Sequence, residues 1–328
     1  MLLAMDIGNS SISIGVFHMN VETQDKDCVV TPEICFKLST DVNRSADEYA
    51  FYLQSAFCLY GCDVGTIHAV MLATVVPNLT DVIRQSLLRI TKAPVFLVGP
   101  GLKSGVNIRT DSPSELGADI VANAVGALSR VSSPIILVDA GTATSVFAID
   151  AHKTILGGCI APGLKIGLEA LKEATSLLPT ASLTLPENLI GKNTDDAVRS
   201  GVIRGHAMML DGMIHAFSEQ LGEKSAVIMT GGFAKVLLPA MQHTVQYAEH
   251  LTLEGIYRIY LLNSHKIHKE VYRSDERCGS LVPLLTKRCI AVDIVVDAAV
   301  DDYYIRIGIQ VERAPRKAKI VTRFRTGL

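Results

Sequence analysis

The chain has 328 residues, of which 48% are hydrophobic and 20% charged, and this favours two domains with substantial hydrophobic cores. Its formal net charge of −2 at pH 7 indicates neither nucleic acid nor an anionic membrane as a partner, and no apolar run approaches the roughly 20 residues that span a bilayer. The 7 cysteines are scattered without a Cys-x-x-Cys pair, so we expect no zinc site, no disulfide framework and a reducing, cytoplasmic location.

The first predicted element is a strand, followed by a polar turn and a second strand. The apolar run from Met1 to Met5 ends at Asp6, Gly8 follows two residues later, and a second strand-like run extends to Phe17. Glycine lets a backbone approach a bound anion, and neighbouring amides and hydroxyls can donate to phosphate oxygens. The aspartate would repel a phosphate, so it suits a metal ion or an ordered water beside the phosphate.

Alternating helices and strands are predicted over the next hundred residues. Ser45, with Glu48 three residues later, has the pattern of a capping box that starts a helix extending to about Tyr60. The other expected elements are strands over residues 68–75 and 94–98 and helices over 79–90 and 115–131.

The first motif then recurs. The strand over residues 134–138 ends at Asp139, and Gly141 and Thr142 follow before a second strand. Each motif by itself could be only a hairpin turn. The repeat favours phosphate binding by a nucleotide held between two similar domains. Helices over 163–173 and 194–221 and a strand over 226–229, which runs into Gly231 and Gly232, complete an α/β architecture built twice.

Three turns, at Asp6, Asp139 and Thr230, resemble the two phosphate motifs and the adenosine motif of the actin/hexokinase/acetate-kinase superfamily. The finer pattern is similar to that of type III pantothenate kinases, in order over residues 2–260. The matching segments include residues 38–41, 74–77, 99–105, 113–119, 157–163, 190–194 and 251–255. The resemblance implies two ribonuclease-H-like domains forming an actin-like ATPase clamp, over residues 1–114 and 115–260, with an extension over 261–328.

The resemblance also implies roles for individual residues. Asp6 would hold Mg²⁺ through water, and Asp139 would hold a monovalent cation, K⁺ or NH₄⁺. Pantothenate would contact residues of one helix start and Thr194, with Thr194 from the same chain or from the partner subunit of a homodimer. The implied ATP contacts are Asp6, Ile7, Gly8, Asn9, Ser10, Ser11, Ile12, Ser13, Thr142, Gly231 and Gly232. The implied pantothenate contacts are Gly117, Ala118, Asp119, Ile120 and Thr194.

Asp119 is the residue to which the resemblance assigns general-base catalysis on the primary hydroxyl of pantothenate. An alcohol is a poor nucleophile near pH 7, and a carboxylate within hydrogen-bond reach helps its attack by roughly 10²–10⁴-fold. Alternatively, Asp119 only complements the dipole of its helix. The context from Glu115 to Asp119 favours catalysis. The implied activity is phosphorylation of pantothenate to 4'-phosphopantothenate by ATP, the first step of coenzyme A biosynthesis.

Two residues depart from the family pattern. Ile120 stands where the family usually has an arginine that helps to hold pantothenate, and Thr110 where it often has a tyrosine. Losing a charged hydrogen bond costs about 1.5–3 kcal/mol, or roughly ten- to a hundredfold in affinity. This keeps two alternatives open: a catalytically weak regulatory homologue of the transcriptional accessory factor type, and a kinase of another small alcohol.

The last segment, residues 261–328, extends beyond the usual end of the family. Residues 289–300 are apolar with two spaced aspartates, the alternation over 303–311 indicates a strand, and residues 313–325 are basic. The favoured interpretation is an appended strand or a partly disordered tail, and the alternative is a nucleic-acid-binding arm.

Overall fold

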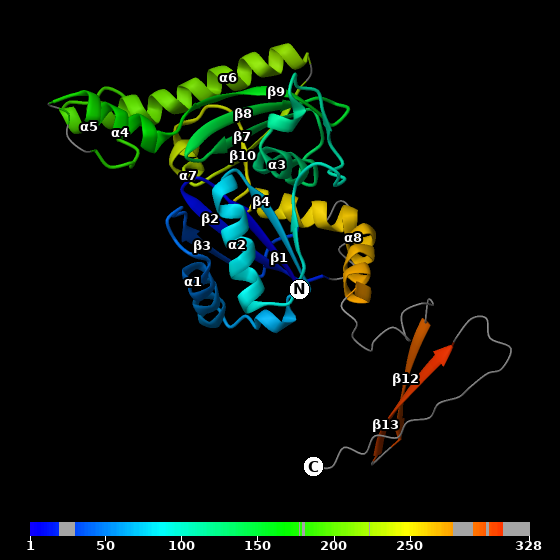
Figure 1. Cartoon of the computed structure of the whole chain (residues 1–328). Coiled ribbons are helices and arrows are strands. Elements are labelled where there is room, and N and C mark those ends of the chain that lie inside the picture. The colour runs from blue at the N-terminus through cyan, green and yellow to red at the C-terminus, as the bar shows by residue number, and fades with distance from the viewer. Residues whose placement is uncertain are drawn as a thin grey trace. The chain divides into compact units, whose positions relative to one another are not determined.

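The computed structural model describes residues 1–19, 30–176, 178, 181–222, 224–277, 291–299 and 302–310. The chain divides into two compact units, Met1–Ser264 and His265–Leu328. The first unit contains two mixed sheets with helices (Figure 1). Among the described residues, no helix is both long and apolar enough to cross a membrane.

The first sheet has five strands in the order β3-β2-β1-β4-β5. The pairs of β1 with β2 and of β2 with β3 are antiparallel, whereas β1, β4 and β5 run parallel. The strands are β1 (Leu2–Ile7), β2 (Ser11–Phe17), β3 (Ile34–Ser39), β4 (Ala69–Thr74) and β5 (Val95–Leu97).

The second sheet repeats this topology. Its order β9-β8-β7-β10-β11 has the same sequence of antiparallel and parallel pairs, with β6 added at the β9 edge. The predicted fold class, α/β with two similar ribonuclease-H-like halves, is confirmed. The strands are β6 (Asn107–Ile108), β7 (Ile135–Ala140), β8 (Ala143–Ile149), β9 (Thr154–Pro162), β10 (Ala226–Thr230) and β11 (Gln246–Tyr247). The domain boundaries given above stay predictions.

Helices cover both sheets (Figure 1). The α1 helix begins after Ser45 with the predicted capping box, in which Glu48 N donates to Ser45 Oγ and Ser45 N to the Glu48 carboxylate. The α-helices of the first unit are α1 (Ala46–Leu59), α2 (Pro77–Ile90), α3 (Ala118–Leu128), α4 (Leu164–Ala174), α5 (Thr194–Arg199), α6 (Gly205–Leu221), α7 (Ala234–Leu237) and the start of α8 (Leu251–Arg277). A π-helical turn, η4 (Ser200–Arg204), joins α5 to α6.

The α3 helix is shorter than the helix predicted over 115–131. Pro113–Glu115 forms a separate 3₁₀ turn, and Leu116 and Gly117 have extended ψ angles of 124° and 141°. Helical hydrogen bonding therefore starts only at Ala118, which places Asp119 in the first turn of the helix.

Alternation along the central strands decides where the two motif aspartates point. In β1, Leu3, Met5 and Ile7 pack into the cluster formed with α1 and α2, so Asp6 lies on the opposite face. In β7, Ile136, Val138 and Ala140 pack into the cluster formed with α6 and α7. Asp139 therefore shares the other face with Ile135 and Leu137, which pack against α3.

The first part of α8 contacts both halves. The Tyr257 ring stacks on Phe17 of β2 with centroids 4.7 Å apart, and a Cβ on Gly15 would lie 3.1 Å from Leu253 Cδ1. On its other side, α8 meets α3 so closely that a Cβ on Gly126 would lie 2.5 Å from the Leu251 carbonyl oxygen. The α8 helix therefore joins the first sheet to α3.

The second unit contains β12 (Ala291–Ala299) and β13 (Asp302–Gln310), which pair antiparallel in a sheet of their own. The strand predicted over 303–311 is confirmed by β13, whereas β12 was not predicted from its apolar stretch. The basic residues 313–325 lie outside the described residues.

Candidate active site

The two predicted phosphate turns meet in the fold. Ser10 Oγ of the first turn lies 2.7 Å from Thr142 Oγ1 of the second, 132 residues later. In each turn the glycine amide donates to a backbone carbonyl at 3.1 Å, from Gly8 N to Ser11 O across three residues and from Gly141 N to Ala143 O across two. Their hydroxyls and amides can therefore face one bound phosphate chain from two sides.

Some residues of the first turn can reach a nucleotide only through their backbone, and others can also reach it through their side chains. Ile7 and Ile12 are fully buried in the hydrophobic core, so only their backbone is available to a nucleotide. Asn9 and Ser10 are exposed at the tip of the turn. Thr40 supports the turn, since its hydroxyl donates to Gly8 O at 2.6 Å.

The predicted adenosine turn packs on the second phosphate turn. Gly231 has φ +99°, and a Cβ there would lie 2.5 Å from the carbonyl of Ala140. Any other residue at this position would have a strained backbone, and its Cβ would overlap the Ala140 backbone. At Gly232, in contrast, no atom lies within 4 Å of an added Cβ. Gly232 therefore leaves space for a flat ligand beside the backbone.

Asp6 is a half-buried residue, but one oxygen of its carboxylate is fully buried and uncompensated. Its Oδ1 has no hydrogen-bond partner among the described residues. Burial, followed by the charges of Asp119 and Asp139, raises the pKa of Asp6 to about 8, although Lys37 opposes the shift. A buried carboxylate in this state is stabilised by a cation.

Asp139 lies near the same carboxylates. Burial, with a smaller effect of the Asp119 charge, raises the pKa of Asp139 to about 6. A hydrogen bond from Asn123 Nδ2 to Asp139 Oδ2, 3.0 Å long, and the charge of Lys37 oppose this shift. Asn123 is 1% exposed and in turn accepts a hydrogen bond from Thr252 Oγ1 at 2.7 Å.

Asp119 is held at the start of α3 by the backbone. Ile120 N donates to Asp119 Oδ1 at 2.8 Å. A side chain at Gly117 would collide with this oxygen, so this orientation of the Asp119 carboxylate depends on glycine two residues earlier. Burial raises the pKa of Asp119, whereas its backbone hydrogen bonds oppose the shift. A carboxylate with a raised pKa is a stronger base once it is ionised.

A cation beside Asp6, Asp119 or Asp139 would be favourable, because the pKa of each of these carboxyl groups is raised when no cation is bound. Across the part of the chain that the structure describes, no three His, Cys, Asp or Glu side chains are close enough to hold one metal ion together. This geometry suits a cation held partly by water and by the ligand's phosphates, as Mg²⁺ commonly is.

Sequence reasoning missed three residues at this site. Lys37 lies opposite Ser13, which lies opposite Asp6, so the three share one face of the first sheet. Asn123 and Thr252 both fall within segments that match the family, over residues 123–125 and 251–255, but no role was predicted for either. The patterns carried no signal for these contacts, since each depends on residues from different elements.

Two predicted pantothenate contacts, Ile120 and Thr194, and the family departure at Thr110 lie in different surroundings. Ile120 is half-buried and packs against the apolar cluster under α3. Thr110 Oγ1 is buried without a hydrogen-bond partner among the described residues. Thr194 is exposed at the start of α5, far from α3 in the view of Figure 1. The single chain therefore brings Asp119 and Ile120 together but not Thr194.

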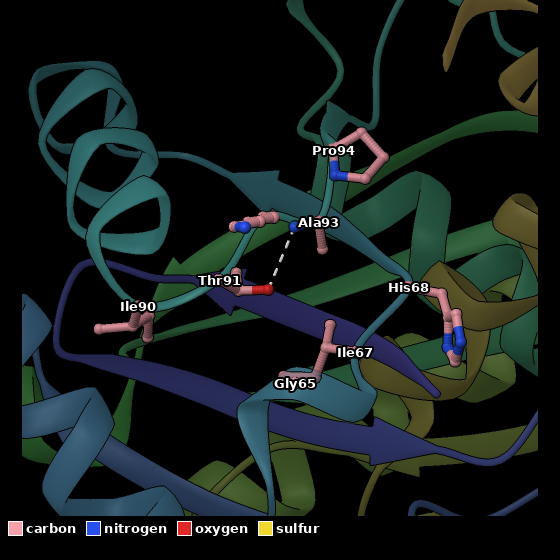
Figure 2. A pocket seen from close by; sticks show the side chains of 8 residues that line it. Gly65, Ile67, His68, Ile90, Thr91, Ala93 and Pro94 are labelled. Carbon is pink, nitrogen blue, oxygen red and sulfur yellow. Dashed lines mark hydrogen bonds between the residues drawn. The ribbon is translucent and has the colours of Figure 1, made fainter. Parts of the chain in front are cut away.

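Two cavities lie outside the carboxylate site. One, of about 410 Å³, is shown in Figure 2, where Thr91 Oγ1 accepts a hydrogen bond from Ala93 N. It lies beside His68 at the start of β4, whereas Asp6 lies at the far end of β1. A second, of about 270 Å³, lies beneath Gly163, which packs on the Thr142 turn, and is bordered by His206.

Comparison with known proteins identifies the family of the chain. The type III pantothenate kinase family model matches residues 2–216. The type III pantothenate kinase of Geotalea daltonii is 35% identical over 263 residues, covering 80% of this chain and 99% of that protein. That of Shouchella clausii is 37% identical over 261 residues, covering 79% and 98%.

Among solved structures, a conserved putative Baf family transcriptional activator from Campylobacter jejuni aligns with a TM-score of 0.52 and 17% identity. The alignment covers 80% of this chain and 99% of that one, and it shows a shared fold alone. Sequence identity to the curated relatives and the family match carry the assignment: the chain belongs to the type III pantothenate kinase family.

Proposed function

We propose that the protein transfers the γ-phosphoryl group of ATP to pantothenate, giving 4'-phosphopantothenate in the first step of coenzyme A biosynthesis. Family membership supports the reaction. The observation that supports the site is the contact between the two phosphate turns at Ser10 and Thr142, beside Asp6, whose pKa is raised by the charges of Asp119 and Asp139.

Asp119 acts as the general base in this proposal. The primary hydroxyl oxygen of pantothenate attacks the γ-phosphorus, and its proton passes to the Asp119 carboxylate. The bond from the γ-phosphorus to the bridging oxygen breaks, and ADP leaves. Burial of Asp119 supports this role, because a raised pKa brings a carboxylate nearer to the working pH.

The phosphates are held by the two turns and by nearby positive charge. Ser10, Thr142 and the turn amides donate to phosphate oxygens, and Lys37 contributes a positive charge beside Asp6 and Asp139. Asp6 would hold Mg²⁺ through water, and the ion would supply positive charge near the phosphates. Gly231 and Gly232 pack against the adenosine.

Asp139 holds a monovalent cation, K⁺ or NH₄⁺. The carboxylate lies beside the Gly141 turn, where an unpartnered negative charge would repel ATP. A single positive charge between the two removes this repulsion.

The enzyme acts as a homodimer, in which Thr194 of one subunit reaches the pantothenate of the other. The separation of α5 from α3 within one chain supports this arrangement. Apolar side chains near Thr194 also support it, because Ile190 is 82% and Leu189 53% exposed.

A cytoplasmic location agrees with the free state of the four cysteines among the described residues, Cys35, Cys58, Cys62 and Cys159.

A coupled ADP-release assay tests the proposal. Purified protein with ATP, Mg²⁺ and K⁺ is expected to release ADP at a rate that depends on pantothenate, with 4'-phosphopantothenate identified by mass spectrometry. ADP release that another small alcohol stimulates more than pantothenate would assign a different substrate. Tight ATP binding with no turnover on either substrate would favour the regulatory alternative.

A further inference from the structure

Two hydrogen bonds connect α8 to Asp139. Thr252 Oγ1 donates to Asn123 Oδ1, and Asn123 Nδ2 donates to Asp139 Oδ2. The other carboxylate oxygen, Oδ1, lies beside the second phosphate turn, since a Cβ on Gly141 would be 3.3 Å from it. One oxygen of Asp139 is therefore held toward α3, and the other faces the turn that carries Thr142.

The direction of these hydrogen bonds is fixed by chemistry. An ionised carboxylate only accepts, so the amide nitrogen of Asn123 must face Asp139. Its oxygen then faces Thr252, whose hydroxyl can donate. Asn123 is 1% exposed, so bulk water cannot replace that donor. Without the hydroxyl, the buried amide oxygen loses its partner, and the amide plane is no longer held against Asp139.

The position of Thr252 is fixed by the close packing of α8 on α3. A side chain at Gly255 would overlap the Ala122 carbonyl, so the two backbones are in contact. Next to it, Arg130 and Glu254 form a two-pronged ion pair with lengths of 2.6 and 2.7 Å, and the Glu254 side chain is 3% exposed. Such pairs fix orientation as well as distance.

We infer that Thr252 is a positioning residue for the monovalent-cation site. Through Asn123, it holds Asp139 Oδ1 toward the Gly141 turn, where the cation would lie between the carboxylate and the phosphates. The inference rests on the proposed function, in which Asp139 binds K⁺ or NH₄⁺. Thr252 itself touches neither substrate nor cation in this scheme.

Cation binding can be followed without turnover. The unfolding temperature is measured with Mg²⁺ and a non-hydrolysable ATP analogue over a KCl series, with tetramethylammonium chloride keeping the ionic strength constant. Thr252→Val, which keeps the shape but removes the hydroxyl, is expected to raise the KCl concentration for half-maximal stabilisation by about tenfold. Thr252→Ser, which keeps the donor, is expected to restore it to within about twofold of the parent.

The matched control is Thr91→Val in the first half. Thr91 is 9% exposed, and its hydroxyl accepts a hydrogen bond from Ala93 N, so the variant also removes a buried hydroxyl. We expect a lower unfolding temperature with an unchanged KCl midpoint. If Thr252→Val behaves like this control, Thr252 is only structural and the inference fails.

A pantothenate-dependent ADP assay on the same proteins distinguishes failure of the Thr252 inference from failure of the proposed kinase activity. Parent protein that turns over pantothenate but shows no stabilisation by KCl beyond tetramethylammonium chloride would overturn the inference and leave the kinase activity standing. A shifted KCl midpoint in Thr252→Val, with no turnover by the parent, would uphold the inference and overturn the proposed substrate.

Discussion

At the scale of single residues, the site is a set of carboxylates whose burial makes them sensitive to charge. Asp6 and Asp139 occupy the same position in two copies of one motif, and Asp119 comes from a helix between them in sequence. Each is raised in pKa mainly by burial. Bound cations are therefore expected to stabilise the site. Replacing one aspartate at a time by asparagine is expected to show what each carboxylate does.

Asp119→Asn is expected to lower kcat by at least about a hundredfold, because the amide cannot accept the hydroxyl proton. The Michaelis constant for ATP should stay nearly unchanged, since Asp119 lies outside both phosphate turns. Steady-state kinetics with pantothenate varied, and a separate ATP-binding titration, provide the check. A variant that keeps more than about half of the parent rate would make Asp119 a structural residue.

The raised pKa of Asp6 predicts how stability depends on pH without cations. Between its ordinary pKa near 4 and its folded value of about 8, the folded protein binds a proton that the unfolded chain has released. Stability therefore falls as pH rises through this window. From pH 6 to pH 8, Asp6 accounts for a loss of about 2 kcal/mol, and Asp139, which is about half protonated at pH 6 in the folded protein, adds a smaller loss.

Asp6→Asn should remove most of this fall, and Mg²⁺ should reduce it in the parent. Urea unfolding in a chelating buffer at pH 6, 7 and 8 measures both effects. Asp81→Asn, on the exposed surface of α2, is the control for losing a surface charge. A parent protein whose stability is flat or rises over this range would show that Asp6 is not buried unpaired.

At the scale of elements, α8 connects the two halves through α3 and β2. Its contact with α3 depends on the absence of side chains at Gly126 and Gly255, which brings backbone against backbone. Its contact with β2 depends on the stacked rings of Phe17 and Tyr257. The α3 helix carries both Asp119 and Asn123, so α8 determines where these groups lie relative to the first sheet.

Gly255→Ala is therefore expected to lower the free energy of unfolding by about 1–3 kcal/mol, because the added methyl group overlaps the Ala122 carbonyl. Gly212→Ala on α6 is the matched control, since no atom lies within 4 Å of a Cβ there. That variant should be neutral or stabilising by about 0.5–1 kcal/mol. Equal effects in urea unfolding would contradict the close contact between α3 and α8.

At the scale of the whole molecule, the proposed homodimer explains why Thr194 lies apart from Asp119 in one chain. Ile190→Glu places a charge on an apolar side chain that is 82% exposed, close to Thr194 in the sequence. We expect this variant to shift from dimer to monomer in light scattering and to lose pantothenate saturation, while ATP binding persists.

Leu59→Glu is the matched control, because Leu59 is 80% exposed on α1 of the first half. It should remain a dimer with the parent's affinity for pantothenate. A dimeric Ile190→Glu variant with ordinary saturation would place the interface elsewhere. A monomeric variant with ordinary saturation would remove Thr194 of the partner from the substrate site.

The sequence by itself determined the features that depend on neighbouring residues. The capping box at Ser45 and the two turns after Asp6 and Asp139 follow from side chains and glycines within a few positions of one another. The repeated motif and the ordered family segments were sufficient to predict the fold class and the nucleotide turns. The predicted start of α3 at residue 115 was wrong, because the spacing of hydrophobic residues does not reveal that the backbone is extended at Leu116 and Gly117.

Only the tertiary structure decided which of these residues meet. Ser10 and Thr142 are 132 residues apart, and Asn123 and Thr252 are 129 apart, so no local pattern could pair them. Their contacts arise because hydrophobic burial brings α8, α3 and both sheets together, and the strand alternation then sets which face each polar side chain occupies. Lys37 joins the site for the same reason, through strand register rather than through any motif.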